Sequence, residues 1–224
     1  CTREVLNKIS YRVMVVLDPI ELEIINFPEN KSEILTAENN QEDESYGSRK
    51  LSFSKNLYIE RDDFKEEANR KYFRLTLDKE VRLKNGYIIK GEKVEKDKEG
   101  NIKKIFCTYD PKSKSGSGSP ESLRKVKGTI HWVDKNNYEN ISVNIYDKLF
   151  LSEAPGEDDE VGIATQINNE SIKTFDRACA EISLRDATFD KYYQFQRKGY
   201  FKLDSKNPKV IFNRTVTLRD NIKY

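Results

Sequence analysis

The sequence of 224 residues is poor in the side chains that usually carry catalysis and metal binding, with a single histidine, His131, and three cysteines. Ser-His-Asp and Cys-His devices would all need His131, and a two-histidine metal site is excluded. Cys1, Cys107 and Cys179 lie far apart without a close C-x-x-C pair, so neither a disulfide framework nor a zinc knuckle is supported. No glycine-rich phosphate loop is present. We therefore expect no catalytic residues, no metal site and a reducing, cytoplasmic compartment.

An excess of one charge is also missing, because 40 Lys and Arg side chains face 38 Asp and Glu side chains and leave a net charge of +2 at pH 7. This balance excludes a uniformly cationic coat for nucleic acid, although a local basic groove remains possible. No apolar run approaches the roughly 20 residues that cross a bilayer, and the start at Cys1 has no signal-peptide core. We expect a soluble protein with no membrane partner.

What the sequence does contain is a regular alternation of apolar and polar residues. Apolar side chains occupy every second position from Ile9 to Leu17, up to a break at Asp18-Pro19, and the rhythm returns over residues 20–24, 126–132 and 141–145. Many short strands of this kind, separated by turns, are typical of β-barrels and β-sandwiches. We predict an all-β protein with few short helices, built from two such units.

Turn and helix signals complete this outline. Gly100 and Asn101 interrupt a charged stretch and predict a long hairpin, because both residues tolerate positive φ. A tight turn is expected at residues 197–199. Only residues 62–69 and 170–180 favour helices, and both would be short. Residues 112–120 are so rich in Ser and Gly that we expect a mobile loop or linker, which divides the chain near its middle.

Several polar side chains stand beside aromatic residues in the predicted strands, namely Arg12, Arg74, Gln194 and Arg197. Such mixtures suit single-stranded RNA, whose unstacked bases offer edges to Arg and Gln and flat faces to rings. Any exposed strand face in a chain this charged would look similar, so the spacing alone favours ordinary solvated surface. His131 is expected to be a packed strand histidine, because no nucleophile lies at a recognisable spacing from it.

Longer strings carry more information than these pairs. Five of them follow one another over essentially the whole chain: Val16–Pro19, Tyr58–Phe64, Cys107–Pro111, Lys125–Trp132 and Phe212–Asp220. In content and order they resemble the C-terminal anticodon-binding region of glutaminyl-tRNA synthetase, a class I aminoacyl-tRNA synthetase. The resemblance implies two β-barrels of the kind shared with a ribosomal RNA-binding protein, placed after a catalytic domain that activates glutamine with ATP and Mg.

This resemblance also implies a domain plan. Residues 1–11 would be the remnant of a connection to the missing catalytic domain, residues 12–119 the first barrel region and residues 120–224 the second, with approximate boundaries and with strands that can be exchanged between barrels. The class I signature is absent, so the chain should bind without turnover, whereas its parent would be a ligase. The expected partners are glutamine tRNA and the catalytic domain of the same parent, and no DNA.

Six residues match anticodon contacts of the family where the local strings agree. Asn7 and Arg12 resemble residues that reach the anticodon loop. Arg74 and Arg82 match arginines for the last and first bases, and Gln194 and Arg197 match residues for the middle and last bases. Glutamine anticodons read C or U, then U, then G. A glutamine amide complements the edge of uracil, while the arginine fork suits guanine or phosphate.

Two departures and two alternatives remain. Phe73 stands where some family members have a lysine, and it would either stack on a base or fill core. Glu42 stands where the family has an asparagine that contacts the last base, so that contact stays unassigned. A related region of a eukaryotic-type glutamyl-tRNA synthetase is one alternative function, and a non-catalytic domain that docks on ribosomal RNA or on protein is the other.

Overall fold

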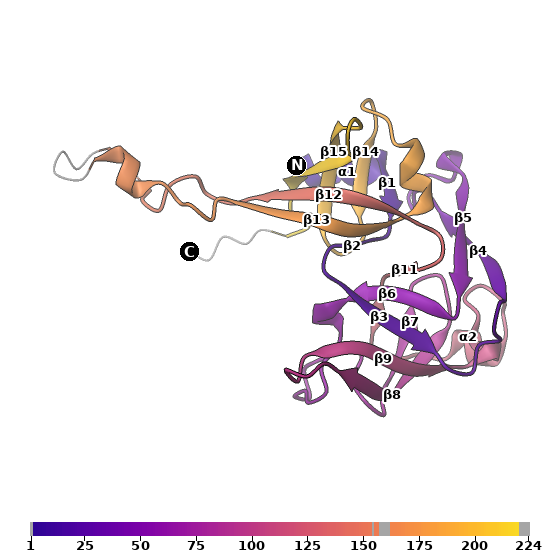
Figure 1. The fold of residues 1–224 in the computed structure, drawn as a ribbon. Coiled ribbons are helices and arrows are strands. Elements are labelled where there is room, and N and C mark those ends of the chain that lie inside the picture. The colour runs from indigo at the N-terminus through magenta and orange to yellow at the C-terminus, as the bar shows by residue number, and fades with distance from the viewer. Residues whose placement is uncertain (1, 154, 157–161, 220–224) are drawn as a thin grey trace.

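The computed structural model describes residues 2–153, 155–156 and 162–219. Two seven-stranded sheets, each curled into a barrel, lie one above the other, and a two-stranded sheet runs beside them (Figure 1). The regular helices are short, α1 (Thr2–Ile9) and α2 (Pro120–Leu123), and 3₁₀ turns supply the rest of the helical structure. The prediction of an all-β protein with two barrels is confirmed.

The first barrel takes its strands from the middle of the chain. Its order is β10-β7-β8-β9-β3-β6-β11, with β3 (Pro19–Ile24), β6 (Asn56–Glu60), β7 (Glu80–Leu83), β8 (Ile88–Lys96), β9 (Ile102–Tyr109), β10 (Thr129–Ile130) and β11 (Trp132–Asp134). The two edge strands, β10 and β11, are separated in the chain only by His131. One extended segment therefore touches both edges of the sheet and nearly closes the barrel.

The second barrel is closed in the same way, by a segment near the start of the chain, residues 10–16. Its order is β1-β14-β15-β16-β12-β13-β2, with β1 (Ser10–Val13), β2 (Val15–Val16), β12 (Tyr138–Tyr146), β13 (Ile172–Glu181), β14 (Tyr192–Phe195), β15 (Gly199–Ser205) and β16 (Ile211–Val216). Here Met14 alone separates the edge strands β1 and β2. The alternation from Ile9 to Leu17 therefore belongs to a single extended segment that is shared between two sheet edges.

The two barrels have the same topology. Passing from one edge to the other, both show parallel, antiparallel, antiparallel, parallel, antiparallel and antiparallel pairings. In the first barrel the closing segment follows the other strands in the chain, whereas in the second it precedes them. Each of the ranges 12–119 and 120–224 consequently contributes strands to both barrels.

Aromatic side chains fill both cores. Trp132 is almost fully buried in the first barrel and meets Phe53 edge to face, with ring centroids 5.2 Å apart. In the second barrel Phe195 stacks on Phe201 at 4.0 Å. Such pairs contribute roughly 0.5–1.5 kcal/mol beyond the burial of their surface. A small third cluster, Val16, Val133 and Cys179, joins the two barrels.

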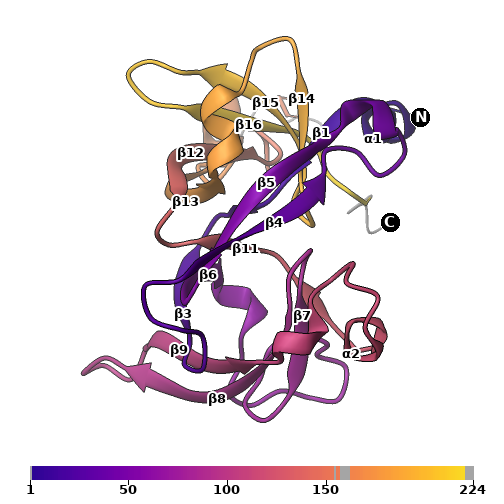
Figure 2. The same ribbon diagram turned by 90° about the vertical axis from the view of Figure 1, so that its right-hand side faces the viewer.

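Each barrel carries a long insertion at the same connection of its topology. Between β3 and β6 lies the bridging arm, made of β4 (Ser32–Glu38) and β5 (Ser48–Ser54) with the 3₁₀ turn η1 (Glu44–Tyr46) at its tip. It runs along both barrels (Figure 2). Between β12 and β13, the described residues of the range 147–171 form the projecting arm, which extends away from the body (Figure 1).

The predicted helix over residues 170–180 is wrong, because this segment is strand β13 and pairs with β12 along its length. The predicted helix over 62–69 is also wrong, since only the single turn η2 (Arg61–Asp63) forms there. Both segments are too short for a helix to be stable without tertiary support. The predicted hairpin between β8 and β9 and the predicted turn between β14 and β15 are confirmed.

Residues 112–120, predicted to be a mobile loop or linker, do form a loop, but it packs against the first barrel and joins two strands of that barrel, β9 and β10, so it does not link the barrels. The 3₁₀ turn η3 (Pro111–Ser113) begins the segment, and the side chain of Ser113 is fully buried. Its hydroxyl accepts a hydrogen bond from the Ile88 N–H at 2.8 Å and donates one to the Asp110 carbonyl. These two hydrogen bonds replace the contacts with water that the Ser113 hydroxyl loses on burial. The polar loop can therefore pack against the first barrel.

Candidate nucleic-acid interface

The first group of predicted residues gathers around Arg12 on β1. Arg12 is 7% exposed, and its guanidinium donates to the Gln41 side chain at 2.6 Å and to Asn7 Oδ1 at 3.0 Å. Glu42 Oε1 lies 3.7 Å from the same guanidinium. The tip of the bridging arm thus holds Arg12 in place. These partners fix the direction of the Arg12 side chain, which also lines a groove between the barrels.

Asn7, at the end of α1, is the centre of this network. Its Oδ1 accepts hydrogen bonds from Gln194 Nε2 and from the Tyr200 hydroxyl, both at 3.4 Å, and its Nδ2 donates to Glu42. Gln194 lies opposite Arg12 in the parallel pairing of β1 with β14. The structure therefore brings together three of the six predicted residues, Asn7, Arg12 and Gln194, from segments far apart in the chain.

A second group surrounds the buried carboxylate of Asp63. Arg197 Nη2 donates to Asp63 Oδ1 at 2.7 Å, and Arg74 Nη1 lies 3.0 Å from the same oxygen, while Arg197 Nη1 donates to Oδ2. Arg197 stands in the turn between β14 and β15 with φ of 68°. Burial tends to lower the pKa of Arg197, but the hydrogen bonds and charge of Asp63 outweigh it and raise that pKa. One carboxylate thus positions two predicted arginines.

Below this group lies a second buried acid, Glu60. Its side chain lies 3.4 Å from His131 and 3.1 Å from the Lys198 ammonium, and it accepts a hydrogen bond from the Leu17 N–H at 2.7 Å. Burial alone would raise the pKa of Glu60, but His131, Lys198 and the Leu17 N–H lower it to about 2. His131 itself is fully buried, as expected for a packed strand histidine.

Arg82, on β7, forms the third group by itself. Its two terminal nitrogens donate to the Ser113 carbonyl at 3.0 Å and to the Ser122 carbonyl at 2.8 Å, with the Ser115 hydroxyl 3.2 Å away. Burial and the charge of Arg124 lower the pKa of Arg82. Arg82 therefore ties the serine-rich loop and α2 to the first barrel.

A groove lies between the two barrels, and Arg12 is the one predicted residue in its lining. Its cavity measures about 210 Å³ and is lined by Arg12, Thr36, Glu38, Gln41, Asn85, Ser115, Gly116 and Gln196. Arg12 belongs to the first group, Ser115 contacts Arg82, and Gln196 precedes Arg197. Amide, guanidinium and hydroxyl groups from both barrels and from the bridging arm thus face one hollow.

Sequence reasoning missed the residues that hold this arrangement. Asn40 is buried and donates to the Lys8 carbonyl at 2.8 Å and to the Ser10 carbonyl at 3.1 Å, so it ends α1 at the right place. Burial and the charge of Arg12 lower the pKa of Lys84. The one sequence signal for Lys84 is its position two residues after Arg82, on the same face of an extended segment.

The two departures from the family pattern have clear positions. Phe73 is 54% exposed, so it does not fill core, and it lines a hollow of about 570 Å³ together with Tyr72, Arg74 and Lys71. Glu42 is part of the Asn7 network. An exposed ring beside cations is a surface on which an unpaired base can stack.

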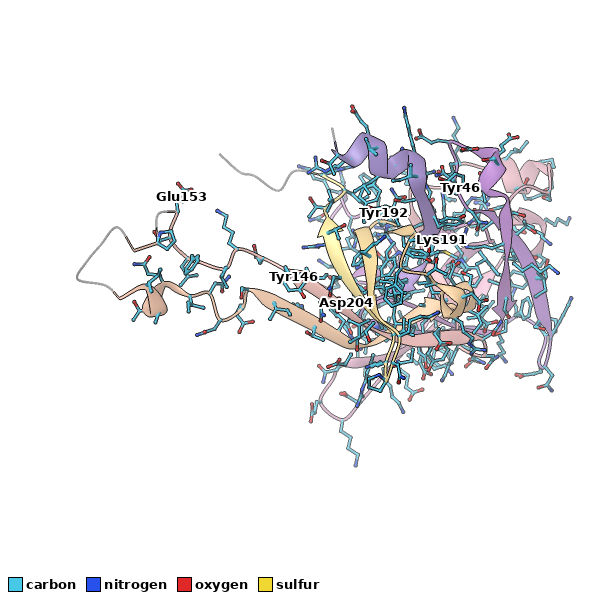
Figure 3. The ribbon with its side chains drawn as sticks, turned by 90° about the horizontal axis from the view of Figure 1, so that it is seen from above. Tyr46, Tyr146, Glu153, Lys191, Tyr192 and Asp204 are labelled. Carbon is cyan, nitrogen blue, oxygen red and sulfur yellow. The ribbon has the colours of Figure 1, made fainter. Side chains whose placement is uncertain are left out.

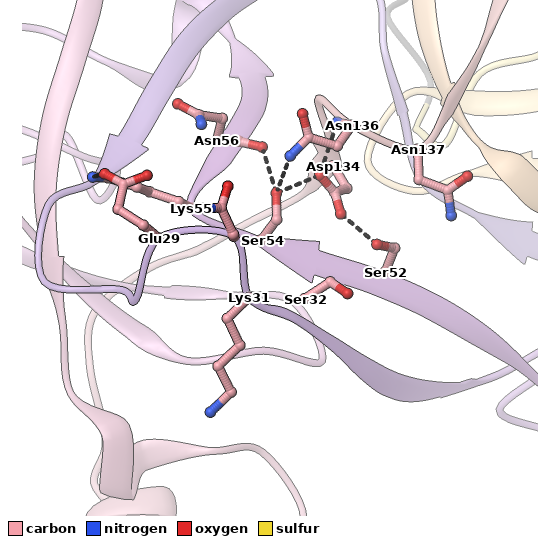
Figure 4. Close-up of a pocket in the computed structure, with 11 residues that line it drawn as sticks. Glu29, Lys31, Ser32, Ser52, Ser54, Lys55, Asn56, Asp134, Asn136 and Asn137 are labelled. Carbon is pink, nitrogen blue, oxygen red and sulfur yellow. Dashed lines mark hydrogen bonds and ion pairs between the residues drawn. The ribbon is translucent and has the colours of Figure 1, made fainter.

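A separate polar pocket of about 470 Å³ contains none of the predicted residues (Figure 4). Asp134 accepts hydrogen bonds there from the Ser52 hydroxyl, from the Ser54 hydroxyl at 2.6 Å and from the Asn136 N–H at 2.9 Å. The hydrogen bonds from Ser52 and Ser54 on β5 to Asp134 on β11 attach the bridging arm to the first barrel. Over the described ranges, no cluster of three or more His, Cys, Asp or Glu side chains is placed to hold a metal, and no helix is long and apolar enough to cross a membrane.

Comparison with known proteins identifies the class first. Two family models, both described as the anticodon-binding domain of class I tRNA synthetases (E and Q), match residues 10–110 and 129–204. The chain belongs to this family.

Within the family the chain is similar to glutamine–tRNA ligases. It is 47% identical over 222 residues to that of Proteus mirabilis (strain HI4320) and over 223 residues to that of Enterobacter sp. (strain 638), in each case across 98% of this chain and 39% of the relative. The enzyme of Rhodopirellula baltica is 47% identical across 97% of this chain and 36% of its own length. The chain thus spans about two fifths of these relatives.

Proposed function

We propose that this chain recognises the anticodon of glutamine tRNA, which reads C or U, then U, then G. The observation that carries the proposal is the hydrogen-bonded network of Asn7, Arg12 and Gln194, of which Arg12 also lines the groove between the barrels. Membership of the anticodon-binding family supports it. The finer claim, that the tRNA carries glutamine, draws support from the glutamine–tRNA ligases to which the chain is similar.

The geometry gives each group a role in this proposal. The Gln194 amide uses Nε2 to bond Asn7, which leaves its carbonyl oxygen to accept the N3–H of the middle uracil. The side chains of Arg74 and Arg197 are 43% and 31% exposed and are held by Asp63, so their remaining donors face solvent in a set direction. Because these guanidinium groups are already ordered, RNA binding loses less side-chain entropy. Arg12 contributes by positioning Asn7, and Arg82 by shaping the groove at the first base.

In this proposal the chemistry belongs to another part of the same protein. A catalytic domain outside this chain would attach glutamine to the tRNA with ATP and Mg, in the cytoplasm, while the 224 residues bind without turnover. The residues described above supply amide, guanidinium and aromatic groups. These suit the reading of unpaired bases and not the transfer of an acyl group.

Titration of the chain with fluorescent tRNA transcripts tests the proposal. One transcript carries C-U-G and a second carries C-C-G, with a substituted middle base. We expect the substitution to weaken binding by roughly tenfold or more, as for a lost base-edge contact. Binding should also weaken steeply with salt, because phosphate contacts release counterions. Equal affinity for the two transcripts would contradict anticodon recognition.

Recognition of glutamate tRNA is a second candidate, because the family description covers both E and Q enzymes. Both anticodons have a middle U, so Gln194 does not separate them. Their last bases differ, G for glutamine and C for glutamate. A transcript that carries C-U-C distinguishes the two candidates, since the glutamine proposal predicts the weaker binding for it.

A further inference from the structure

His131 lies between a carboxylate of the first barrel and a guanidinium that the second barrel supplies. It is fully buried between β10 and β11, where one extended segment meets both edges of the first barrel. Its Nε2 lies 3.4 Å from Glu60 Oε1, and its Nδ1 lies 3.2 Å from Arg197 Nη1. Both ring nitrogens therefore face charged groups, one of each sign.

These two neighbours determine which ring nitrogen carries the proton. A guanidinium can only donate hydrogen bonds, so the contact with Arg197 requires an unprotonated Nδ1. The negative charge of Glu60 favours the proton on Nε2. The ring is thus neutral, with an acceptor facing Arg197 and its N–H facing Glu60, and Glu60 fixes the tautomer that Arg197 needs.

Arg197 uses three of its five N–H groups on the first barrel. One Nη1–H goes to Asp63 Oδ2 and the other to His131 Nδ1, while one Nη2–H goes to Asp63 Oδ1 at 2.7 Å. The Nε–H and the second Nη2–H take no partner among the described residues. They lie parallel on one side of the planar group, and the side chain is 31% exposed. Arg197 therefore presents one pair of donors at a fixed angle to the first barrel.

Two parallel N–H donors match the O6 and N7 acceptors of guanine, and this is the commonest specific contact of arginine with a base. Unpaired bases of RNA leave that edge open. Cytosine carries an amino donor on the corresponding edge, so it does not accept the same pair. The glutamine anticodon contains one invariant guanine, its last base, and the glutamate anticodon has cytosine there. The donor pair of Arg197 is thus suited to separate the two.

We propose that His131 is a positioning residue for the last anticodon base, because it directs the Nε–H and Nη2–H of Arg197 to O6 and N7 of guanine. This inference rests on the proposed function, since it assigns the guanine of the glutamine anticodon to Arg197. Asp63 does not hold the angle alone, because Arg74 lies 3.0 Å from the same Oδ1. Without the acceptor on His131 the guanidinium can pivot about Asp63, and its freed Nη1–H can bond to other bases.

Two substitutions of His131 separate its two nitrogens. His131→Asn keeps an acceptor oxygen at the position of Nδ1, whereas His131→Gln keeps a donor at the position of Nε2 and lacks that acceptor. The full chain is titrated with fluorescent transcripts that carry C-U-G or C-U-C, and the readout is the ratio of the two dissociation constants. His131→Gln should lower this ratio about three- to tenfold, the effect of one lost hydrogen bond. His131→Asn should keep it within about twofold of the wild type.

Further variants separate positioning from structural damage. The ratio compares two RNAs on one protein, so partial unfolding of a variant cancels from it. Arg197→Lys removes the donor pair, and adding His131→Gln to it should lower the ratio no further, because His131 acts through Arg197. Tyr146→Ala is the control, since it removes a 49% exposed tyrosine near the projecting arm and away from Tyr192, where β14 begins (Figure 3). The ratio should not change in this variant.

A modified RNA tests the same contact without any substitution in the protein. A C-U-G transcript with 7-deazaguanine as its last base keeps O6 but lacks N7. It should bind the wild-type chain about three- to tenfold more weakly than the unmodified transcript, because one of the two acceptors is gone. Unchanged affinity overturns the proposal, since no guanine contact of this kind would then exist for His131 to orient.

The remaining outcomes are equally decisive. An unchanged ratio in His131→Gln overturns the role of His131, and so does an equal fall in His131→Asn. If His131→Gln weakens binding of both transcripts equally, the donors of Arg197 hold a phosphate and the reading of guanine is overturned. A wild-type chain that fails to distinguish C-U-G from C-C-G overturns the proposed function. If the wild type does distinguish them and His131→Gln leaves the ratio unchanged, only this inference falls.

Discussion

The bridging arm and the projecting arm are inserted at the same point of the same topology, yet they behave in opposite ways. The bridging arm buries charged groups against both barrels, with Arg49 paired to Glu181 at 8% and 5% side-chain exposure. The projecting arm leaves large apolar side chains in solvent, with Leu149 at 57%, Leu151 at 74% and Ile163 at 55% exposure. A shared insertion point therefore leaves open whether an arm becomes scaffold or free surface. The arm that makes polar contacts with the barrels, such as the Arg49–Glu181 ion pair, is the one that is part of the scaffold.

The strongest way to break this contrast is to remove the ion pair that attaches the bridging arm to the second barrel. Arg49→Met leaves the Glu181 carboxylate buried and without its cation, which should lower the free energy of unfolding by about 3 kcal/mol. Urea denaturation, monitored by the fluorescence of Trp132, measures this free energy of unfolding. Arg185→Met is the matched control, because Arg185 is 65% exposed where it pairs with Glu139, and it should cost at most about 1 kcal/mol. Equal losses in the two variants would contradict a structural role for the arm.

Glu60 sharpens the comparison, because it stabilises the body without either arm. Its pKa falls from the ordinary 4.5 to about 2 in the folded protein. A carboxylate with a depressed pKa contributes its full stability above the unfolded value and loses it as the pH falls from 4.5 towards 2. Over this window the wild type should lose about 3 kcal/mol more than Glu60→Gln, by urea denaturation at a series of pH values. Parallel curves for the two proteins would contradict this assignment.

Asn40 connects the tip of the bridging arm to the candidate interface. Asn40→Ala removes the hydrogen bonds to the Lys8 and Ser10 carbonyls and should cost about 1–3 kcal/mol of stability. Because α1 then ends less firmly, Asn7 shifts and binding of the C-U-G transcript should weaken. Asn137→Ala changes an exposed asparagine elsewhere and serves as the control. If Asn40→Ala bound the transcript with wild-type affinity, the tip of the bridging arm would have no role in RNA binding.

The smallest effect is expected on the projecting arm. Leu151→Ser replaces a side chain that is 74% exposed, so the free energy of unfolding should change by less than about 0.5 kcal/mol. Affinity for the transcript should also stay the same. A drop in stability comparable with that of Arg49→Met would show that the projecting arm, too, is structural.

Much of the fold could be predicted from local signals. Alternation located β1, β2, β3, β10, β11 and part of β12, and Gly100 with Asn101 located the hairpin between β8 and β9. Strand order could not be read in this way. The parallel pairing of Ser10 with Tyr192 depends on contacts between distant segments, and no local pattern encodes it. For the same reason β13 was mistaken for a helix, since its pairing with β12 overrides a weak local preference.

The residues of the candidate site could be predicted from the family resemblance, but the hydrogen bonds and ion pairs that hold them could not. Asn7, Arg12 and Gln194 do lie together, whereas the burial of Arg12 and the carboxylate shared by Arg74 and Arg197 were invisible in the sequence. Asn40 and Asp63 matter only through their tertiary neighbours, and an isolated Asn or Asp carries no such signal. The RNA contacts of the six residues remain predictions.

The split closing segments have a consequence for synthesis on the ribosome. Every strand of the first barrel has been translated once Asp134 has been added, so that barrel can complete itself while the chain is still growing. Among the strands of the second barrel, the segment around Met14 is synthesised before the others, yet Tyr192, the partner of Ser10, follows 182 positions after Ser10. At about 5–20 residues per second, this nascent segment waits on the order of 10 to 40 seconds with both edges unpaired. The first strands of the second barrel to be synthesised are therefore among the last to be paired.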